Sequence, residues 1–541
     1  LLELFWLFGI VIFYGDFDFL EFENPIPYIE GFDDASLLAD FMNAYDELLA
    51  RLKDIDLISQ IGGLLGWDQE VMMPPKAAAL RAEQISWISK TGHLKMTDAR
   101  IGELLDELES HKDLDEVQVG NVRLARNSYD KATKLPTEFV GELAKHQSKS
   151  QISWTEARAK DDFSIFRDDL VKMVEMSRLK ADYLGYENLR YDALLDLYES
   201  GLTVARVDPL FAGLRDNVAP LVKAVIDSGK RPNMSFVEDN KWGQAGQEAL
   251  SHAVSETIGF DFSAGRRDAS THPFCGGSNP DDVRWTTRYS ESDPFGSLYG
   301  SMHETGHGLY EQGRPRSLDF QPTGNANGLG VHESQSRLWE NQVGRSREFC
   351  EWALPLWQES FPEFMEGVSA EDLWRAVNLV EPSLIRVEAD EATYNLHIMI
   401  RYEVEKQLIA GEIEVDDLPQ VWDDMYEEFL GIRAPNHTLG VLQDIHWSFG
   451  AFGYFPTYTL GNLYSAQLLE AARKVLPDHD EQIRNGEFEP LLAWMREHVH
   501  ARGSIIEPAA LIEEATGSPP SPDAFVAYLR DKIERLYGVS A

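Results

Sequence analysis

Apolar residues recur every three or four positions along most of this 541-residue chain. That spacing places them on one face of an α-helix, and glycine or proline separates many of the apolar stretches. The pattern predicts helices at residues 37–61, 97–127, 137–181, 203–228, 371–380, 384–410 and 522–537. We therefore expect an all-α fold in which β-structure is a minor part.

One segment departs from the helical pattern. From Val283 to Tyr289, tryptophan, threonine and tyrosine replace the helix formers, and polar residues alternate with bulky ones. The alternation predicts a short strand, which would form part of a hairpin or small sheet. An unpaired edge of this strand would let an extended peptide add to it through backbone hydrogen bonds. A purely structural hairpin is the alternative.

The rest of the chain gives no sign of division into several domains. After residue 37, no linker rich in proline, serine or glycine interrupts the sequence, and no short-period repeat is present. Such linkers and repeats are the usual marks of multidomain and repeat proteins. Residues 34–541 are therefore predicted to form one large domain.

Residues 1–33 differ from this domain in composition. The apolar run from Leu4 to Tyr14 precedes an acidic and aromatic stretch from Asp16 to Glu30. A secretory signal needs a positively charged start, but the first basic residue is Arg51. The apolar run is also too short to span a bilayer. We expect an extension outside the domain and assign it no function; attachment to a membrane surface is the alternative.

The strongest chemical signal is the segment His303-Glu304-Thr305-Gly306-His307. On a helix, residues four positions apart lie on the same face, so both imidazoles can bind one zinc ion. A helix is expected here because flanking apolar residues keep helical spacing and a stop signal follows. These residues are Phe295, Leu298, Met302 and Leu309, with the stop at Gly313 and Pro315. Two solvated histidines on a surface helix are the alternative.

Catalytic zinc usually takes three protein ligands and leaves a further position to water. Glu333 is the predicted third ligand, because it follows the loop Gly324 to Gly330 and begins another helical pattern that continues to Val343. The loop would allow this second helix to return against the first. His332 is the alternative third ligand.

Several separate blocks of the sequence resemble the carboxypeptidase Taq (M32) family of thermostable metallocarboxypeptidases, over about residues 37 to 541. Besides the zinc-binding pattern, the blocks are Trp67-Asp68-Gln69-Glu70, Met73-Pro74, Arg81-Ala82-Glu83-Gln84, His272-Pro273-Phe274, Asp282 to Arg288, His332-Glu333-Ser334, Ile385-Arg386 with Ala389-Asp390, Gly440 with Gln443 to Trp447, Gly453 to Tyr458, and Trp494, His500, Gly517 and Tyr528-Leu529. A chance match to all of these in order is improbable.

The resemblance implies one large helical zinc-peptidase domain of the gluzincin type, with a deep groove and a minor β hairpin or sheet near the active site. It also implies a homodimer with one Zn2+ per chain, and Co2+ suits the same ligands. The expected activity is removal of single residues, with broad specificity, from the free C-terminus of peptides. A helical gluzincin oligopeptidase that cuts internally and a catalytically silent peptide-binding protein are the alternatives.

For peptide hydrolysis, Glu304 is the predicted general base, because it lies beside the metal and is not needed as a ligand. The resemblance places His446 and Tyr458 in the active site, where either would donate a hydrogen bond to the oxyanion. Tyr454 is the alternative phenol. Each of these residues has a second interpretation as a hydrogen-bonded core residue.

The resemblance also implies that Arg386 binds the free carboxylate of the substrate, a task that suits the planar guanidinium. An internal salt bridge from Arg386 to Glu388 or Asp390 is the alternative. Carboxylates that orient the zinc histidines are expected as well. Asp282 and Asp444 lie in matching blocks, but neither is assigned to that role.

Composition excludes some classes of function. The net charge of −42, from 91 acidic and 49 basic residues, argues against a nucleic-acid partner, because a phosphate backbone requires clustered positive charge. We interpret the excess as a solvated acidic shell suited to salty surroundings, with ordinary acidic drift as the alternative. With only Cys275 and Cys350, no disulfide framework exists, so a reducing, cytoplasmic compartment is expected.

Overall fold

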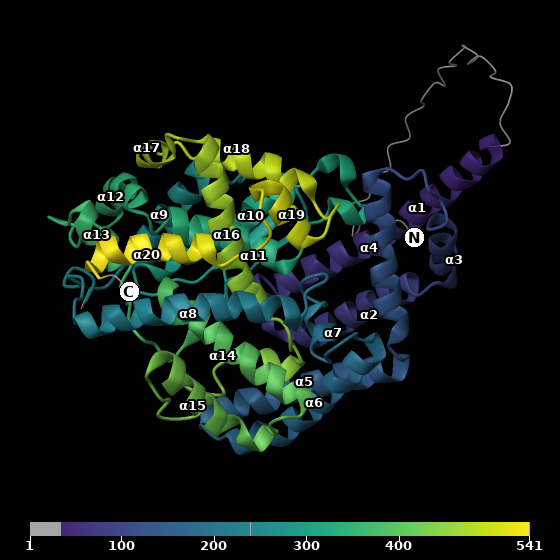
Figure 1. Cartoon of the computed structure of the whole chain (residues 1–541), viewed down its shortest axis with the longest axis horizontal. Helices are drawn as coiled ribbons and strands as arrows, with labels where there is room; N and C mark the ends of the chain where they lie inside the picture. Colours follow the sequence, from purple (N-terminus) through teal and green to yellow (C-terminus); the bar gives the residue numbers. More distant parts are fainter. Residues whose placement is uncertain (1–33, 239, 540–541) are drawn as a thin grey trace, which may run out of the picture.

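The computed structural model describes residues 34–238 and 240–539, and it is mostly helical (Figure 1). The expected all-α fold with minor β-structure is confirmed. The helices are α1 Asp34–Val71, α2 Ala78–Met96, α3 Ala99–Leu108, α4 Glu116–Lys134, α5 Thr137–Lys160, α6 Phe163–Leu184, α7 Asp192–Leu195, α8 Val204–Ser228, α9 Gln244–Thr257, α10 Gly296–Gly313, α11 Leu329–Arg337, α12 Arg347–Ser360, α13 Ala370–Ala376, α14 Glu391–Ala410, α15 Leu418–Leu430, α16 Pro456–Val475, α17 His479–Arg484, α18 Glu489–His498, α19 Pro508–Thr516 and α20 Asp523–Tyr537. The strands are β1 Gly265–Ala269, β2 Cys275–Asn279 and β3 Asp282–Thr287.

Two of the predicted helices are each divided in the structure. The stretch 97–127 forms α3 and α4, because Asp115 caps a new helix through a reciprocal capping box with Gln118. The stretch 137–181 forms α5 and α6, because Asp161 adopts a left-handed conformation with φ 54° and Asp162 caps the next helix. Apolar spacing continues across both breaks, so it did not reveal the caps.

The sheet has the order β1-β3-β2, with β1 parallel and β2 antiparallel to β3. The strand predicted from Val283 is confirmed as β3. The expectation that it offers an unpaired edge is wrong, because hydrogen-bonded neighbours lie on both sides of it. Fully buried Trp285 lies on β3 and explains the central position, since large apolar residues favour the interior strand. Within the described residues, β1 and β2 are the edge strands.

The buried apolar residues form two separate clusters. The larger one fills the body of the molecule and includes the fully buried tryptophans 242, 285, 339, 357 and 422. The smaller one joins α1, α3 and α4 around Leu48, Leu104 and Leu105. Figure 1 shows α1 to α4 together at one side of the molecule, with the described C-terminus near the opposite side. The body and the N-terminal helices thus have their own cores.

The body brings α10 and α11 together at its centre, and α11 also packs against α16. Small residues make this close packing possible. A Cβ on Gly306 of α10 would lie 2.5 Å from the backbone oxygen of Gln335, and a Cβ on Gly461 of α16 would lie 2.4 Å from Glu333 Cγ. Glycine at these two positions lets α10 and α16 approach α11 from both sides.

Two further expectations concern the whole chain. The boundary predicted at residue 34 stays a prediction, since residues 1–33 lie outside the described residues. Of the helices that the structure describes, none is long and apolar enough to cross a membrane.

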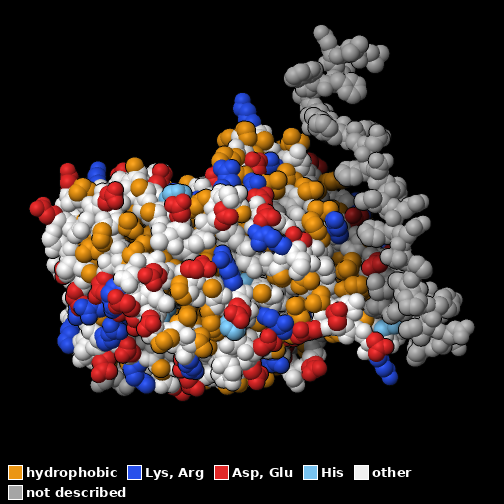
Figure 2. Space-filling view, turned by 90° about the horizontal axis from the view of Figure 1, so that it is seen from above, with side chains coloured by type: hydrophobic (Ala, Val, Ile, Leu, Met, Phe, Trp, Pro, Cys, Tyr) orange, Lys and Arg blue, Asp and Glu red, His pale blue; other side chains and the backbone are white. Residues whose placement is uncertain are grey.

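Figure 2 shows acidic side chains spread over the visible face, with basic side chains between them and no continuous basic stripe.

Candidate active site

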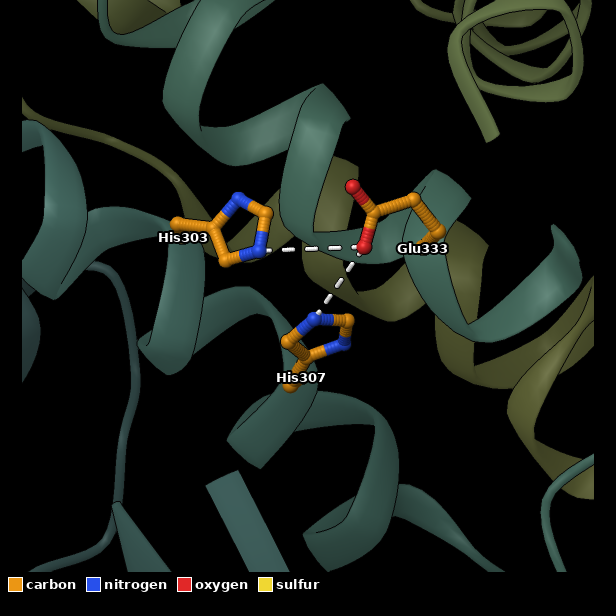
Figure 3. A group of neighbouring side chains, drawn as sticks. All are labelled: His303, His307 and Glu333. Atoms are coloured by element: carbon orange, nitrogen blue, oxygen red, sulfur yellow. Dashed lines mark ion pairs between the residues drawn. The ribbon is translucent and has the colours of Figure 1, made fainter. Parts of the chain in front are cut away.

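Helix α10 presents the two predicted histidine ligands on one face, and α11 brings the predicted carboxylate opposite them. Nε2 of His303 lies 3.7 Å from Oε2 of Glu333, and Nε2 of His307 lies 3.4 Å from the same oxygen (Figure 3). One ligand atom from each of the three residues lies within 4.8 Å of the others. Two imidazole nitrogens and one carboxylate oxygen at this separation match the donor set of a catalytic zinc site.

His332, the alternative third ligand, has both ring nitrogens engaged elsewhere. Its Nδ1 lies 2.6 Å from Nδ1 of His307, and its Nε2 lies 2.9 Å from Oε1 of Glu311. Arg314 in turn contacts Glu311 at 2.8 Å. His332 therefore holds the nitrogen of His307 that faces away from Glu333, and Glu333 is the carboxylate that faces both α10 histidines.

We call His303, His307 and Glu333 the trio. Two charged residues that the sequence analysis did not identify, Glu340 and Arg337, bind the ring nitrogen of His303 and the carboxylate oxygen of Glu333 that do not face the other members. Nδ1 of His303 donates a hydrogen bond of 2.9 Å to Oε2 of Glu340, which leaves Nε2 directed toward Glu333. Arg337 donates to Oε1 of Glu333 at 2.7 Å and to Glu340 at 3.2 Å. The spacing of seven between Glu333 and Glu340 is close to two helical turns, but Glu340 lies in a π-helical segment, Leu338–Val343, so α-helical spacing alone did not identify it.

The electrostatics favour the cation-binding protonation states of Glu333 and His307, whereas Glu333 and Glu340 outweigh burial and raise the pKa of His303. Burial raises the pKa of the Glu333 carboxyl, but the Arg337 guanidinium and the two imidazoles outweigh burial and hold that pKa well below its usual range. Burial lowers the pKa of His307 to about 4. The site therefore offers an anionic carboxylate and a neutral imidazole.

Glu304 lies on the same helix as the histidines and is 6% exposed. Its carboxylate has no hydrogen-bond partner among the residues that the structure describes, so both oxygens are available to water or substrate. Burial raises its pKa to about 7, with a smaller opposing effect from His303. A carboxylate poised near neutral pH, with free oxygens, is suited to proton transfer.

A second group of charged side chains, which we call the arginine group, consists of Arg386, Arg401 and Asp444. Nε and Nη2 of Arg386 donate to Oδ1 of Asp444 at 3.1 and 2.9 Å, and its Nη1 donates to the hydroxyl of Tyr394 at 3.1 Å. Arg401 binds the other oxygen of Asp444 at 2.6 Å. The predicted alternative of an internal salt bridge thus occurs with Asp444, and not with Glu388 or Asp390.

His446 and the two candidate phenols lie beside this arginine group. Nδ1 of His446 lies 3.9 Å from Asp444 Oδ1 and is buried without a hydrogen bond. The Arg386 guanidinium lies 5.1 Å from the centre of the Tyr458 ring, and the Tyr454 ring lies 5.3 Å from the Tyr458 ring. Burial lowers the pKa of His446 to about 4 and raises the pKa of both phenols, so all three remain neutral hydrogen-bond donors.

One side chain connects the arginine group with the trio. The Tyr394 ring lies 4.4 Å from the Arg337 guanidinium, while its hydroxyl accepts the hydrogen bond from Arg386. Because Arg337 binds Glu333, only two side chains separate the predicted carboxylate-binding arginine from the predicted metal ligand. The sequence positions 333, 394 and 386 gave no indication of this chain of contacts.

Helix α14 fixes the loop that carries His446. Buried Glu405 accepts hydrogen bonds from the indole of Trp447 at 2.7 Å, from the hydroxyl of Tyr191 at 2.6 Å and from the backbone of Gly453 at 2.8 Å. Burial raises its pKa to about 7. Arg401, one turn earlier on α14, binds Asp444 at the start of the same loop.

Within the described residues, the candidate partners Asp282 and Asp444 do not contact the two histidines of α10. Asp282 accepts from Arg284 at 2.7 Å, and Asp444 is held by the two arginines. Cys275 and Cys350 are both free thiols. Burial raises the pKa of the Cys275 thiol well above its usual value, and the carboxylates of Glu304 and Glu311 add to that rise.

Known proteins share this sequence and this fold. The model of the carboxypeptidase Taq (M32) metallopeptidases matches residues 47–533. Thermostable carboxypeptidase 1 of Thermus thermophilus is 42% identical over 92% of this chain and 99% of its own length. Carboxypeptidase 1 of Bacillus subtilis is 39% identical over 91% of this chain and 98% of its own length.

Solved structures give the same result. The crystal structure of an M32 carboxypeptidase from Deinococcus radiodurans R1 has a TM-score of 0.89 and 40% identity, over 92% of this chain and 100% of the other. A carboxypeptidase structure from Pyrococcus furiosus has a TM-score of 0.89 and 38% identity, over 91% of this chain and 99% of the other.

Proposed function

This chain belongs to the carboxypeptidase Taq (M32) family and is a metallocarboxypeptidase, and on that premise we propose how its own residues perform the reaction. The proposed reaction is the zinc-dependent removal of single residues, with broad specificity, from the free C-terminus of peptides. The observation that supports it is the convergence of His303, His307 and Glu333 beside a carboxylate, Glu304, whose oxygens have no partner among the described residues.

The three converging residues fit a zinc ion. Their donors are two imidazole nitrogens and one carboxylate, and hydrogen bonds to Glu340 and Arg337 orient them from outside. Zinc bound there would acidify a water molecule and polarise the scissile carbonyl. Co2+ would accept the same ligands.

Glu304 is the proposed general base. It takes a proton from the attacking water as the new carbon–oxygen bond forms, and it later gives that proton to the nitrogen of the leaving amine. The pKa of about 7 suits both transfers, because the group gains and loses a proton near neutral pH. Its burial also keeps bulk water from competing for the proton.

His446 and Tyr458 are the proposed donors to the negative charge that grows on the carbonyl oxygen. Both remain neutral, so each retains an N–H or O–H to donate. His446 is the stronger candidate, because one of its ring nitrogens has no partner among the described residues. Tyr454 is the alternative phenol.

Arg386 is the proposed binding group for the C-terminal carboxylate of the substrate. Two guanidinium groups, of Arg386 and Arg401, share the single negative charge of Asp444. The buried group therefore keeps one uncompensated positive charge, which a substrate carboxylate would neutralise. This excess supports carboxylate binding even though Arg386 already has a protein partner.

The remaining expectations concern the surroundings of the enzyme. We propose peptides as its substrates, a homodimer as its assembly and the cytoplasm as its location. The free thiols of Cys275 and Cys350 are compatible with a reducing compartment. Light scattering coupled to gel filtration would test the dimer, and a monomer at all concentrations would contradict it.

Mass spectrometry of one incubated peptide, with and without a chelator, tests the proposed activity. We expect a ladder of products, each one residue shorter at the C-terminus, and no ladder after metal removal. Two complementary internal fragments would instead identify an oligopeptidase. An intact peptide in the presence of zinc would contradict the enzymatic proposal.

A further inference from the structure

Helix α11, which carries the proposed metal ligand Glu333, begins without a side-chain cap of its own. Its N-cap residue is Gly328, in the left-handed region with φ 45°. The first backbone N–H groups of a helix have no partner inside it, so other groups must accept their hydrogen bonds. Leu329 and Gly330 are the first two residues of α11. The contacts of their amides therefore affect where Glu333, three positions further on, is held.

Both amides bind a turn from a distant part of the sequence. The N–H of Leu329 donates to the backbone oxygen of Tyr198 at 3.2 Å, and the N–H of Gly330 donates to Oε2 of Glu199 at 2.8 Å. The turn follows α7, and the N–H of Glu199 is itself held by the backbone oxygen of Leu195 at 3.1 Å. Glu199 lies 131 positions before Gly330, so α11 is capped from outside the helix.

The carboxyl of Glu199 fits closely against the start of α11. Glu199 is 2% exposed. A Cβ on Gly328 would lie 2.3 Å from its Oε2, and a Cβ on Gly330 would lie 2.9 Å from its Oε1, so the carboxyl occupies space that both glycines leave. Burial raises the pKa of Glu199 to about 8, although hydrogen bonds from Gly330 and Tyr464 lower it. At neutral pH the capping oxygen therefore belongs mainly to an uncharged carboxyl.

Glu333 is thus held both by its side chain and by its helix. Arg337 binds its carboxylate at 2.7 Å, and Glu199 binds the first turn of α11. We propose that Glu199 is a positioning residue for metal binding, because capping α11 fixes the backbone that presents Glu333 to the two histidines of α10. This inference rests on the zinc site proposed above.

Removing the capping oxygen should weaken metal binding without removing a ligand. The first turn of α11 would then leave its place in a larger fraction of the metal-free molecules, and zinc would bind only the remainder. Glu199→Met keeps the length of the side chain but lacks the oxygen, and we expect zinc affinity to fall about tenfold in a chelator competition. Glu199→Gln retains an oxygen for the Gly330 amide and should stay within about twofold of the wild type.

Asp192 provides a matched control in the same part of the chain. It is 8% exposed, and its Oδ1 accepts from the N–H of Val204, the first residue of α8, at 2.7 Å. Asp192 therefore caps a helix from outside, as Glu199 does, but α8 carries no residue of the proposed site. Asp192→Leu keeps the shape of the side chain without its oxygens. Urea unfolding should show a loss of stability in this variant, while its zinc affinity should equal that of the wild type.

Hydrogen exchange of the full-length chain gives a readout that is independent of activity. In metal-free Glu199→Met, we expect the amides of residues 329–337 to exchange about tenfold faster than in the wild type, because a helix that opens more often exchanges faster. Saturation with zinc should remove most of this difference, since the metal would connect α11 to α10. The amides of residues 204–228 should exchange at the wild-type rate.

Four results would overturn the proposal. Equal zinc affinity in Glu199→Met and the wild type would show that the cap does not position the ligand, while the zinc site itself would stand. Equal losses in Glu199→Met and Asp192→Leu would identify general destabilisation as the cause. A loss in Glu199→Gln as large as in Glu199→Met would show that the capping oxygen is not responsible. A wild-type chain that binds no zinc would contradict the proposed metal site, and this inference with it.

Discussion

The trio on α10 and α11 and the arginine group around Asp444 are both buried and charged, but they are built at different ranges in the sequence. His303, His307 and Glu333 lie within 31 positions, and a helical spacing of four sets the first two. Arg386 and Arg401 meet an aspartate 58 and 43 positions away. Local spacing therefore determines the first group, whereas tertiary packing determines the second.

The two groups also differ in the balance of their acidic and basic side chains. Around the trio, Arg337 binds both Glu333 and Glu340, and Glu340 accepts a hydrogen bond from His303, an arrangement that suits the cation that we propose to bind there. In the arginine group, one carboxylate, Asp444, binds two guanidiniums, which suits the anion that we propose to bind there. A carboxypeptidase needs both, since the metal activates the scissile bond and the anion site identifies the end of the peptide. Each prediction below tests one side of this contrast.

Glu304→Gln should have the largest effect. Removing a general base costs about 10²- to 10⁴-fold in rate, and we expect a loss of about 10³-fold in kcat. Zinc content should stay at the wild-type level, because Glu304 is not among the converging ligand atoms. Steady-state kinetics with elemental analysis would measure both. A variant that loses its zinc but regains full activity in excess metal would contradict the role.

The first group could be predicted from sequence because its geometry is local. The step of four on α10 and the loop before Glu333 were sufficient to place three side chains together. The same reasoning missed Glu340, although it lies seven positions after Glu333. Glu340 lies beyond the end of α11, within the π-helical segment Leu338–Val343, where α-helical spacing no longer applies.

The second group could not be predicted in this way. Arg386 was expected to pair with a near neighbour, Glu388 or Asp390, but its partner arrives from the loop after α15. Likewise, the strand at Val283 was predicted from its residues, while its central position depends on β1 and β2, which have weak strand signals of glycine and charge. Composition and spacing did not predict which distant segments of the chain pair with each other.

Glu405→Gln should change the pH dependence of stability. The folded pKa of about 7 is above the usual value, so folding takes up a proton between these values and stability falls as the pH rises through 7. The full shift corresponds to about 3 kcal/mol. The amide that replaces the carboxyl cannot titrate, so the difference in unfolding free energy between variant and wild type should change by about that amount between pH 4.5 and pH 8.

Urea unfolding at the two pH values would measure this difference. Glu403→Gln is a matched control, because Glu403 lies on the same helix but pairs with Lys406 near the surface. A difference that is constant from pH 4.5 to 8 would show that Glu405 does not titrate in this range. The anchor of the His446 loop would then be independent of pH.

Arg386→Ala should separate the two groups in function. We expect a loss of about 100-fold in kcat/KM on peptides with a free C-terminus, because one charge-assisted pair of hydrogen bonds is lost. Amidated peptides should be cleaved at an unchanged rate. Asp444 keeps Arg401 as a partner, so the fold should persist. Equal losses on free and amidated ends would refute carboxylate recognition.

Glu340→Gln should have the smallest effect. It tests whether the negative charge of Glu340 contributes to the zinc affinity of the trio. The amide can still accept from Nδ1 of His303, but the negative charge that strengthens this imidazole as a ligand is gone. We expect zinc affinity to fall about tenfold in a chelator competition, at the low end of such changes. Glu348→Gln, on α12 and paired with Arg484, is the matched control and should leave the affinity unchanged. If both variants bound zinc equally, the hydrogen bond alone would orient His303, and the negative charge of Glu340 would have no part in the affinity of the proposed cation site.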